Sequence, residues 1–181
     1  MKNAEIALLS LIAEQPCHGY QIEQLIEERG MRDWTEIGFS SIYYLLNKLE
    51  KAGLIQSSLE QPQGQGPARK KYKLLPAGKE ALEKAVCEAL SQPFHCYHPL
   101  QLGLANLPIL GLQKAAEALS EHAAALEARL AELQQTRKRQ QPLPYHVEKM
   151  FEHSQVLIEA EVAWLFEVCK ELEDSHEQDK L

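Results

Sequence analysis

Apolar side chains in the first third of the chain recur every three or four positions, which is the spacing of one helix face. The first such segment covers residues 3–14, and the second runs from Tyr20 to a stop at Gly30. The third covers residues 40–52, begins at serines that can cap a helix, and ends at Gly53. We therefore predict three consecutive helices, with residues 18–20 as a turn before the second.

The pattern changes after the third segment. Leu54 begins a short strand, and residues 71–75 alternate between polar and apolar side chains as a returning strand does. Between them, residues 61–68 hold two prolines, two glycines and no large apolar side chain, which is typical of a loop. A fourth helix is expected from Pro76 to about residue 90. This order is that of a winged helix-turn-helix, whose second and third helices form the unit that contacts DNA.

The second half of the chain carries a sustained heptad pattern. From Leu112 to Leu133, leucine and alanine recur at intervals of 4, 3, 4, 3, 4 and 3, which is typical of a coiled coil. A last helix is expected over residues 145–174. Two long helices do not easily bury both apolar seams in one hairpin, so we expect helices of a second chain to cover them; an intramolecular hairpin is the alternative. The predicted dimer residues are Leu112, Leu119, Leu126, Leu130, Leu133, Ile158, Val162 and Leu165.

These elements predict a mainly α chain with a small β-hairpin. Residues 1–90 would form the winged helix-turn-helix domain. Residues 91–109, which hold three prolines and no charged side chain, would form a junction with room for one short helix. Residues 110–181 would form a long, coiled-coil-like dimerisation domain.

The net charge of −7 at first argues against a nucleic-acid partner, but its distribution removes the objection. Residues 1–85 hold 11 basic and 11 acidic side chains, whereas residues 86–181 hold 8 and 15. Within the neutral half, residues 69–73 form a basic run. Because charges are screened beyond about 8–10 Å, DNA responds to this local surface rather than to the acidic half.

The four cysteines form no C-x-x-C pair and suggest no disulfide framework. The longest apolar stretch near the start, residues 6–13, is too short to span a bilayer and lacks the features of a signal peptide. We therefore expect a cytoplasmic protein with reduced thiols. Neither a G-x-S-x-G motif, a P-loop nor a dinucleotide fingerprint is present, so an enzyme is not expected.

The third predicted helix has two distinct faces. Its apolar side chains at 42, 45, 46 and 49 would face the core, which leaves its polar side chains, Lys51 among them, to face a major groove. Asn47 can pair with adenine and Lys48 with guanine or phosphate. The alternative is a set of solvated polar positions on a winged helix that binds protein. The predicted DNA-binding residues are Ser40, Ser41, Tyr43, Tyr44, Asn47 and Lys48, with Arg69, Lys70 and Lys71 beside the wing.

Three runs in the first half resemble the PadR family of bacterial transcriptional regulators: HGYQIEQL (18–25), SSIYYLLNKLEKAGLI (40–55) and RKKYKLLPAGKEAL (69–82). The sequence departs from the family pattern at Tyr44, where many members have proline, and at Leu75, where a threonine usually caps the next helix. Beyond about residue 85 the resemblance is looser, and is to the longer members that include the phenolic-acid-responsive repressor.

The heptad pattern favours a homodimer that binds an inverted repeat, with recognition helices roughly 34 Å apart. The resemblance implies a repressor that is relieved by a small, often aromatic ligand, which would favour a dimer geometry that does not match the DNA. Aromatic rings can stack on such a ligand, although a tryptophan at helical spacing is more often part of a core. The candidate effector residues are Phe94, Tyr97, Trp34 and Trp164.

Histidine and cysteine gather between the two halves. His95, Cys96 and His98 lie close in sequence, with Cys87 before them, and both residue types bind zinc and related metals. Their spacing matches no familiar site. A metal-responsive regulator is therefore an alternative hypothesis; otherwise no metal and no cofactor is expected.

Overall fold

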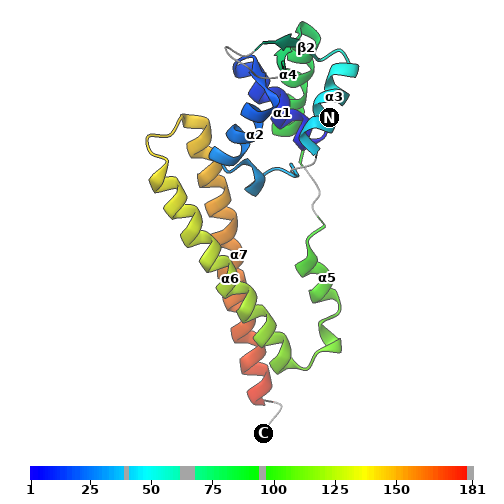
Figure 1. The fold of residues 1–181 in the computed structure, drawn as a ribbon. Coiled ribbons are helices and arrows are strands. Elements are labelled where there is room, and N and C mark those ends of the chain that lie inside the picture. The colour runs from blue at the N-terminus through cyan, green and yellow to red at the C-terminus, as the bar shows by residue number, and fades with distance from the viewer. Residues whose placement is uncertain (39–40, 62–67, 94–96, 179–181) are drawn as a thin grey trace. The chain divides into compact units, whose positions relative to one another are not determined.

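The helices and strands of the first half of the chain meet around one apolar core (Figure 1). The structure, a computed structural model, describes residues 1–38, 41–61, 68–93 and 97–178. Its first unit, Met1–His95, contains α1 (Asn3–Glu14), β1 (Cys17–His18), α2 (Gly19–Glu28), the 3-10 helix η1 (Met31–Asp33), α3 (Ser41–Lys51), β2 (Ile55–Glu60), β3 (Arg69–Leu74) and α4 (Pro76–Ser91). This order of elements confirms the winged helix-turn-helix fold.

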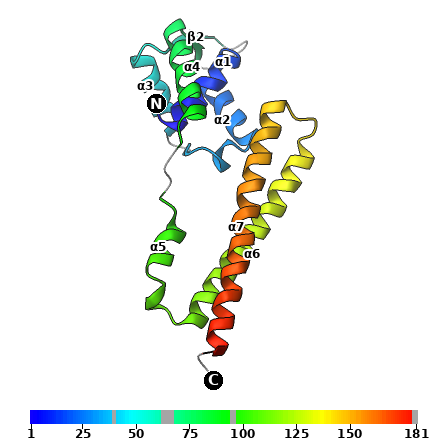
Figure 2. The ribbon, with the colours of Figure 1, turned by 180° about the vertical axis from the view of Figure 1, so that it is seen from behind.

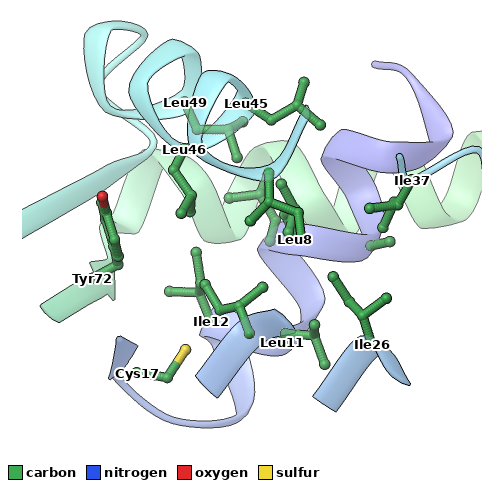
Figure 3. Close-up of a cluster of buried hydrophobic side chains, with 14 of the residues drawn as sticks. Leu8, Leu11, Ile12, Cys17, Ile26, Ile37, Leu45, Leu46, Leu49 and Tyr72 are labelled. Atoms are coloured by element: carbon green, nitrogen blue, oxygen red, sulfur yellow. The ribbon is translucent and has the colours of Figure 1, made fainter. Parts of the chain in front are cut away.

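Most of the core side chains on α1, α2 and α3 lie at positions that the helical spacing selected. Figure 3 shows side chains of α1, α2, α3 and β3 converging on one another. Leu8, Ile26 and Leu46 are completely buried. Because burying one side chain of this size contributes about 1.5–3 kcal/mol, the core fixes how α3 is rotated about its axis and so which of its side chains face outward.

The wing is a three-stranded antiparallel sheet in the order β1-β3-β2. β2 and β3 pair along their whole length and end at Glu60 opposite Arg69. The interpretation of residues 18–20 as a turn was wrong, because Cys17 and His18 pair with the middle of β3 as a third strand and α2 begins at Gly19. A strand of two residues is too short to show the alternation that identifies strands in a sequence.

Glycines shape the ends of the elements around α3. Gly30 follows α2 and Gly53 follows α3, with φ angles of 57° and 69°, in the left-handed region that glycine adopts without strain. Gly78 has another role, since a Cβ there would lie 2.0 Å from the carbonyl oxygen of Leu54. The start of α4 therefore packs directly on the root of the wing. Leu75 precedes α4 without a side-chain cap, as expected from its departure from the family's threonine.

The second unit, Cys96–Leu181, is built on a hairpin of two long helices. It contains α5 (Pro99–Ala105), the 3-10 helix η2 (Leu107–Ile109), α6 (Leu112–Arg139) and α7 (Tyr145–Gln178). Figure 1 and the view from behind in Figure 2 both show α6 and α7 packed side by side. Among the helices of the described ranges, none combines the length and the apolar character that crossing a membrane requires.

The heptad seam of α6 packs against α7 of the same chain. Leu119 and Ala123 of α6 are buried against Leu165 and Cys169 of α7, and Cys169 Sγ lies 3.8 Å from the carbonyl oxygen of Ala116. The expectation that one hairpin does not easily bury both seams was wrong for this central stretch, because alanines let the helices approach closely. Of the predicted dimer residues, Leu119, Ile158 and Leu165 are buried in this way, while Leu112, Leu126, Leu130, Leu133 and Val162 are half-buried.

Candidate nucleic-acid interface

The outward side of α3 is a polar stripe. Tyr44, Asn47 and Lys51, at spacings of three and four residues, lie opposite the buried side chains of this helix and are all exposed. Tyr44 is 68% exposed. The three residues, here called the outer stripe, present a hydroxyl, an amide and an ammonium group, which can hydrogen-bond to base edges and phosphates.

Tyr43 lies at the edge of the outer stripe, where α3 meets the start of α2. A Cβ on Gly19 would lie 2.8 Å from Cε1 of the Tyr43 ring. The absence of a side chain at Gly19 therefore leaves room for the ring to pack on the start of α2, and a Cβ there would displace the ring. Since 53% of Tyr43 remains exposed, the residue both fixes the two helices of the helix-turn-helix and contributes to the surface beside the stripe.

Lys48, predicted to contact guanine or phosphate, is held by a carboxylate of α1. Its ammonium group forms a short ion pair with Glu5, whose side chain is only 8% exposed. The other carboxylate oxygen of Glu5 accepts a hydrogen bond of 3.0 Å from the backbone N–H of Lys2. The hydrogen bond from Lys48 lowers the pKa of Glu5 against the opposing effect of burial, and the same contact raises the pKa of Lys48. The free protein therefore uses Lys48 as a tie between α1 and α3.

The serines at the start of α3 were among the predicted DNA-binding residues. Ser41 is half-buried, and its hydroxyl donates a hydrogen bond of 2.7 Å to the carbonyl oxygen of Gly38. Ser40 lies outside the described residues, as does the expected tip of the wing, residues 62–67.

Two of the wing cations face carboxylates. Lys70 Nζ lies 3.7 Å from Glu50 Oε2, and Lys71 Nζ lies 3.3 Å from Glu60 Oε2. Both pairs are partly exposed, and exposed pairs contribute little to stability. Either lysine can therefore exchange its carboxylate for a phosphate at small cost.

The third wing cation stacks on the start of α2. Arg69 Cζ lies 5.1 Å from the centre of the Tyr20 ring, a cation–π distance, and the same ring stacks on His18 with their centres 5.7 Å apart. His18 Nε2 lies 3.1 Å from Glu60 Oε2, and its Nδ1 lies 3.1 Å from the carbonyl oxygen of Lys70. The first residues of α2 and the outer half of the wing therefore form one connected polar surface.

Glu50 links α3 to both long strands of the wing. Its Oε1 accepts hydrogen bonds from the backbone N–H of Ser57, at 2.9 Å, and from the Ser57 hydroxyl, while its Oε2 faces Lys70. These contacts, the Ser57 hydroxyl first, lower the pKa of Glu50. The sequence interpretation missed both Glu5 and Glu50, since it looked for cations and amides. For Glu50, the sequence offered one indication, its place within the family-like run 40–55.

The aromatic residues proposed to bind an effector lie at exposed positions. Trp34 follows η1 in the first unit and is 52% exposed. In the second unit, Tyr97 lies before α5, and Trp164 is 40% exposed on α7. Two open grooves of the second unit are lined by polar and apolar residues of α6, α7 and the turn between them, and neither Tyr97 nor Trp164 lines them. Phe94 lies outside the described residues.

The histidine and cysteine residues of the metal-responsive alternative fall partly outside the described part of the chain, where His95 and Cys96 lie. Cys87 is exposed on α4 of the first unit. His98 Nε2 lies 3.7 Å from Glu161 Oε1 in the second unit. Among the residues that the structure describes, no group of three or more histidine, cysteine or acidic side chains could hold a metal ion.

A comparison with protein-family models assigns the first unit. Residues 8–84 match the model of the transcriptional regulator PadR-like family. The match covers most of the winged helix-turn-helix unit and stops before the second unit. The matched residues include α3, both long strands of the wing and Glu50. No curated protein sequence matches the chain.

Solved structures of PadR-like proteins share the fold over nearly the whole chain. PadR of Bacillus subtilis in complex with operator DNA is 22% identical and superimposes with a TM-score of 0.76 over 93% of this chain and 98% of that chain. The same protein in complex with p-coumaric acid is 20% identical, with a TM-score of 0.76 over 95% and 99%. A PadR-like transcriptional regulator from Bacillus cereus is 18% identical, with a TM-score of 0.69 over 94% and 98%. At these identities the likeness establishes the fold of both units.

Proposed function

We propose that this PadR-like chain is a sequence-specific repressor that binds an inverted-repeat operator as a homodimer and is released by a small, aromatic ligand. The observation that supports DNA binding best is the outer stripe of α3, which lies exposed beside a wing that carries three cations. The operator and p-coumaric acid complexes of Bacillus subtilis PadR support the same two kinds of partner here, because the fold is shared. We place this activity in the cytoplasm, where bacterial DNA lies.

The contacts with DNA follow from the geometry of α3 and the wing. A helix fits the major groove, where the Asn47 amide can pair with the N6 and N7 atoms of adenine. Lys51 and Tyr44 extend the same face toward bases or phosphates. Arg69, Lys70 and Lys71 neutralise phosphates once they leave their partners in the free protein. Tyr43 and the serines at the start of α3, Ser40 and Ser41, complete the contact, and Lys48 joins it only where its pair with Glu5 opens.

The proposed dimer uses apolar side chains that one chain leaves uncovered. Met150, Leu157 and Trp164 are spaced by seven residues along α7 and are 40%, 57% and 40% exposed. They lie about a quarter of a turn from Ile158 and Leu165, which face the inside of the hairpin. An apolar stripe of this kind, on a helix that already has a buried face, is typical of an interaction surface. A second copy that covers it would form a two-fold dimer beside the half-buried residues of the original seam.

Selection of bound fragments from random duplex DNA tests the proposal. We expect a recovered inverted repeat, and a binding constant whose logarithm falls linearly with that of the salt concentration, by about 0.9 for each phosphate contacted. A winged helix that binds protein instead would show no salt-dependent retention on duplex DNA. Repeating the binding with hydroxylated aromatic acids such as p-coumaric acid should lower the affinity; an unchanged affinity with every such acid would contradict the ligand part alone.

A further inference from the structure

We infer that Glu50 is a positioning residue that fixes the wing relative to α3, and so sets how many phosphates the wing reaches. This inference rests on the proposed binding of DNA. Glu50 contacts neither base nor phosphate in this assignment; it acts through Ser57 when DNA is bound, and it also faces Lys70 in the free protein. Its carboxylate is the point at which three elements, α3, β2 and β3, meet through polar atoms.

The first contact gives a hydrogen-bond acceptor to a backbone N–H on an edge strand of the sheet. β2 is an edge strand, because the strand order is β1-β3-β2. The backbone N–H of Ser57 donates to Glu50 Oε1 at 2.9 Å, and the Ser57 hydroxyl donates to the same oxygen. Two donors from one residue of the strand therefore meet one carboxylate oxygen of the helix. A charged acceptor makes hydrogen bonds about twice as strong as a neutral one, so this contact fixes the root of β2 firmly.

The second contact reaches the other long strand. Lys70 Nζ lies 3.7 Å from Glu50 Oε2, so the carboxylate also faces β3. On β3, Tyr72 lies opposite Ser57 of β2 and is 3% exposed. Burial raises the pKa of Tyr72 first, and the nearby charge of Glu50 raises it further. The carboxylate thus lies against the root of the wing from the side of α3.

Because this contact lies at the root of the wing, a small rotation there displaces the wing cations by a larger distance. Ser57 and Tyr72 lie three residue pairs before Glu60 and Arg69, at the end of the described hairpin. At about 3.3 Å per residue this is about 10 Å, so a rotation of about 10° at the root moves Arg69 by about 1.7 Å. Hydrogen bonds to phosphate tolerate only about 0.5 Å, from about 2.7 to 3.2 Å. A small loss of order at Glu50 therefore removes phosphate contacts at the wing and leaves the outer stripe in place.

The test is a double-mutant cycle between Glu50→Gln and Arg69→Ala, read as affinity for the selected operator over a range of salt concentrations. In the wild-type background we expect Arg69→Ala to weaken binding about tenfold and to reduce the salt slope by about 0.9. In the Glu50→Gln background the wing no longer reaches the phosphate, so Arg69→Ala should change affinity less than twofold and leave the slope unchanged. Glu80→Gln, at an exposed carboxylate of α4, is the matched control and should preserve the full effect of Arg69→Ala.

A residue that merely stabilised the fold would lower the melting temperature and leave the effect of Arg69→Ala intact well below that temperature. An undiminished effect of Arg69→Ala in folded Glu50→Gln would thus overturn the inference. Ser57→Ala, which removes only the hydroxyl, provides a second cycle if Glu50→Gln does not fold, and should show the same loss of coupling in part. If the wild-type protein binds no DNA, the proposed function fails, and the inference with it; loss of coupling alone leaves the function standing.

Discussion

Replacing Lys48 with methionine separates two roles that a lysine on a recognition helix can have. Lys48→Met keeps the aliphatic stem and removes the charge. It removes the cation that pairs with the Glu5 carboxylate, whose side chain is 8% exposed. The backbone N–H of Lys2 then remains as the hydrogen-bond donor to this carboxylate. If Lys48 mainly ties α1 to α3, the variant should lose stability. If Lys48 mainly contacts a base, the variant should lose sequence preference instead.

The size of the effect follows from the state of Glu5. A buried charged acceptor that loses its partner costs on the order of 1–3 kcal/mol. For a domain of this size that corresponds to a fall in Tm of roughly 5–20 °C. Glu5→Gln should cost less, because a neutral amide tolerates the site better than an unpaired carboxylate. The double variant, Glu5→Gln with Lys48→Met, should recover much of the loss of Lys48→Met.

Acid titration gives an independent check of the same pair. Lys48 lowers the pKa of Glu5 in the folded protein, so the contribution of this carboxylate is present above its unfolded pKa and is lost as the pH falls through the lowered folded value. In Lys48→Met the lowering disappears, and the loss of stability between neutral and acid pH should become shallower. The assays are thermal unfolding between pH 3 and 7 and binding to operator variants. An unchanged Tm with a changed base preference would refute the structural role.

Three further variants test the two units. Asn47→Ala, on the outer stripe, should change discrimination at a single base pair by about 1–3 kcal/mol in operator binding, with Tm unchanged; equal losses on all sequences would point to a phosphate contact. Leu165→Ala, completely buried in the second unit, should cost about 2–5 kcal/mol in denaturant unfolding, and a much smaller loss would contradict a packed hairpin. Leu157→Glu, on the uncovered stripe of α7, should give a folded monomer by light scattering, whereas a persistent dimer would exclude this stripe as the interface.

The architecture of the first unit could be predicted because the apolar residues whose spacing indicates its helices also form its core. The apolar side chains whose spacing indicates α3 are the same side chains that pack in the core, as Leu46 and Leu49 show. Gly53 ends the helix in the left-handed region, where its residue type indicated an end. Local sequence and tertiary packing agree at these positions, so a pattern of a few residues suffices.

The partners of the charged residues could not be predicted in this way. Glu5 and Lys48 are 43 residues apart in sequence, and nothing local to either indicates the other. Within the basic run 69–71, the sequence shows three similar cations, whereas the strand directs each to a different group. Which carboxylate a cation meets depends on the packing of separate elements. Tyr44, Asn47 and Lys51 are exposed on α3, as the spacing predicted, whereas the sequence did not indicate which carboxylates pair with Lys48, Lys70 and Lys71.

The second unit illustrates a different limit. A heptad pattern identifies the apolar face of a helix, but the same face can be covered by the next helix or by another chain. Leu119 and Leu165 are buried in the same apolar cluster inside one hairpin. The surface left for a partner lies on a different side of α7, where the apolar stripe at Leu157 is shorter and is flanked by charged side chains.

The internal compensation of the basic residues has a consequence for how the protein would search a chromosome. Lys48, Lys70 and Lys71 each face a carboxylate of the same unit, so much of the positive field is cancelled a few ångströms from the surface. Encounters with arbitrary DNA are then weakly attractive and brief. Only a sequence that lets α3 settle in the groove keeps phosphates in place long enough for the lysines to exchange partners. Discrimination would thus come partly from short residence on the wrong sequence, at little expense of stability in the free protein.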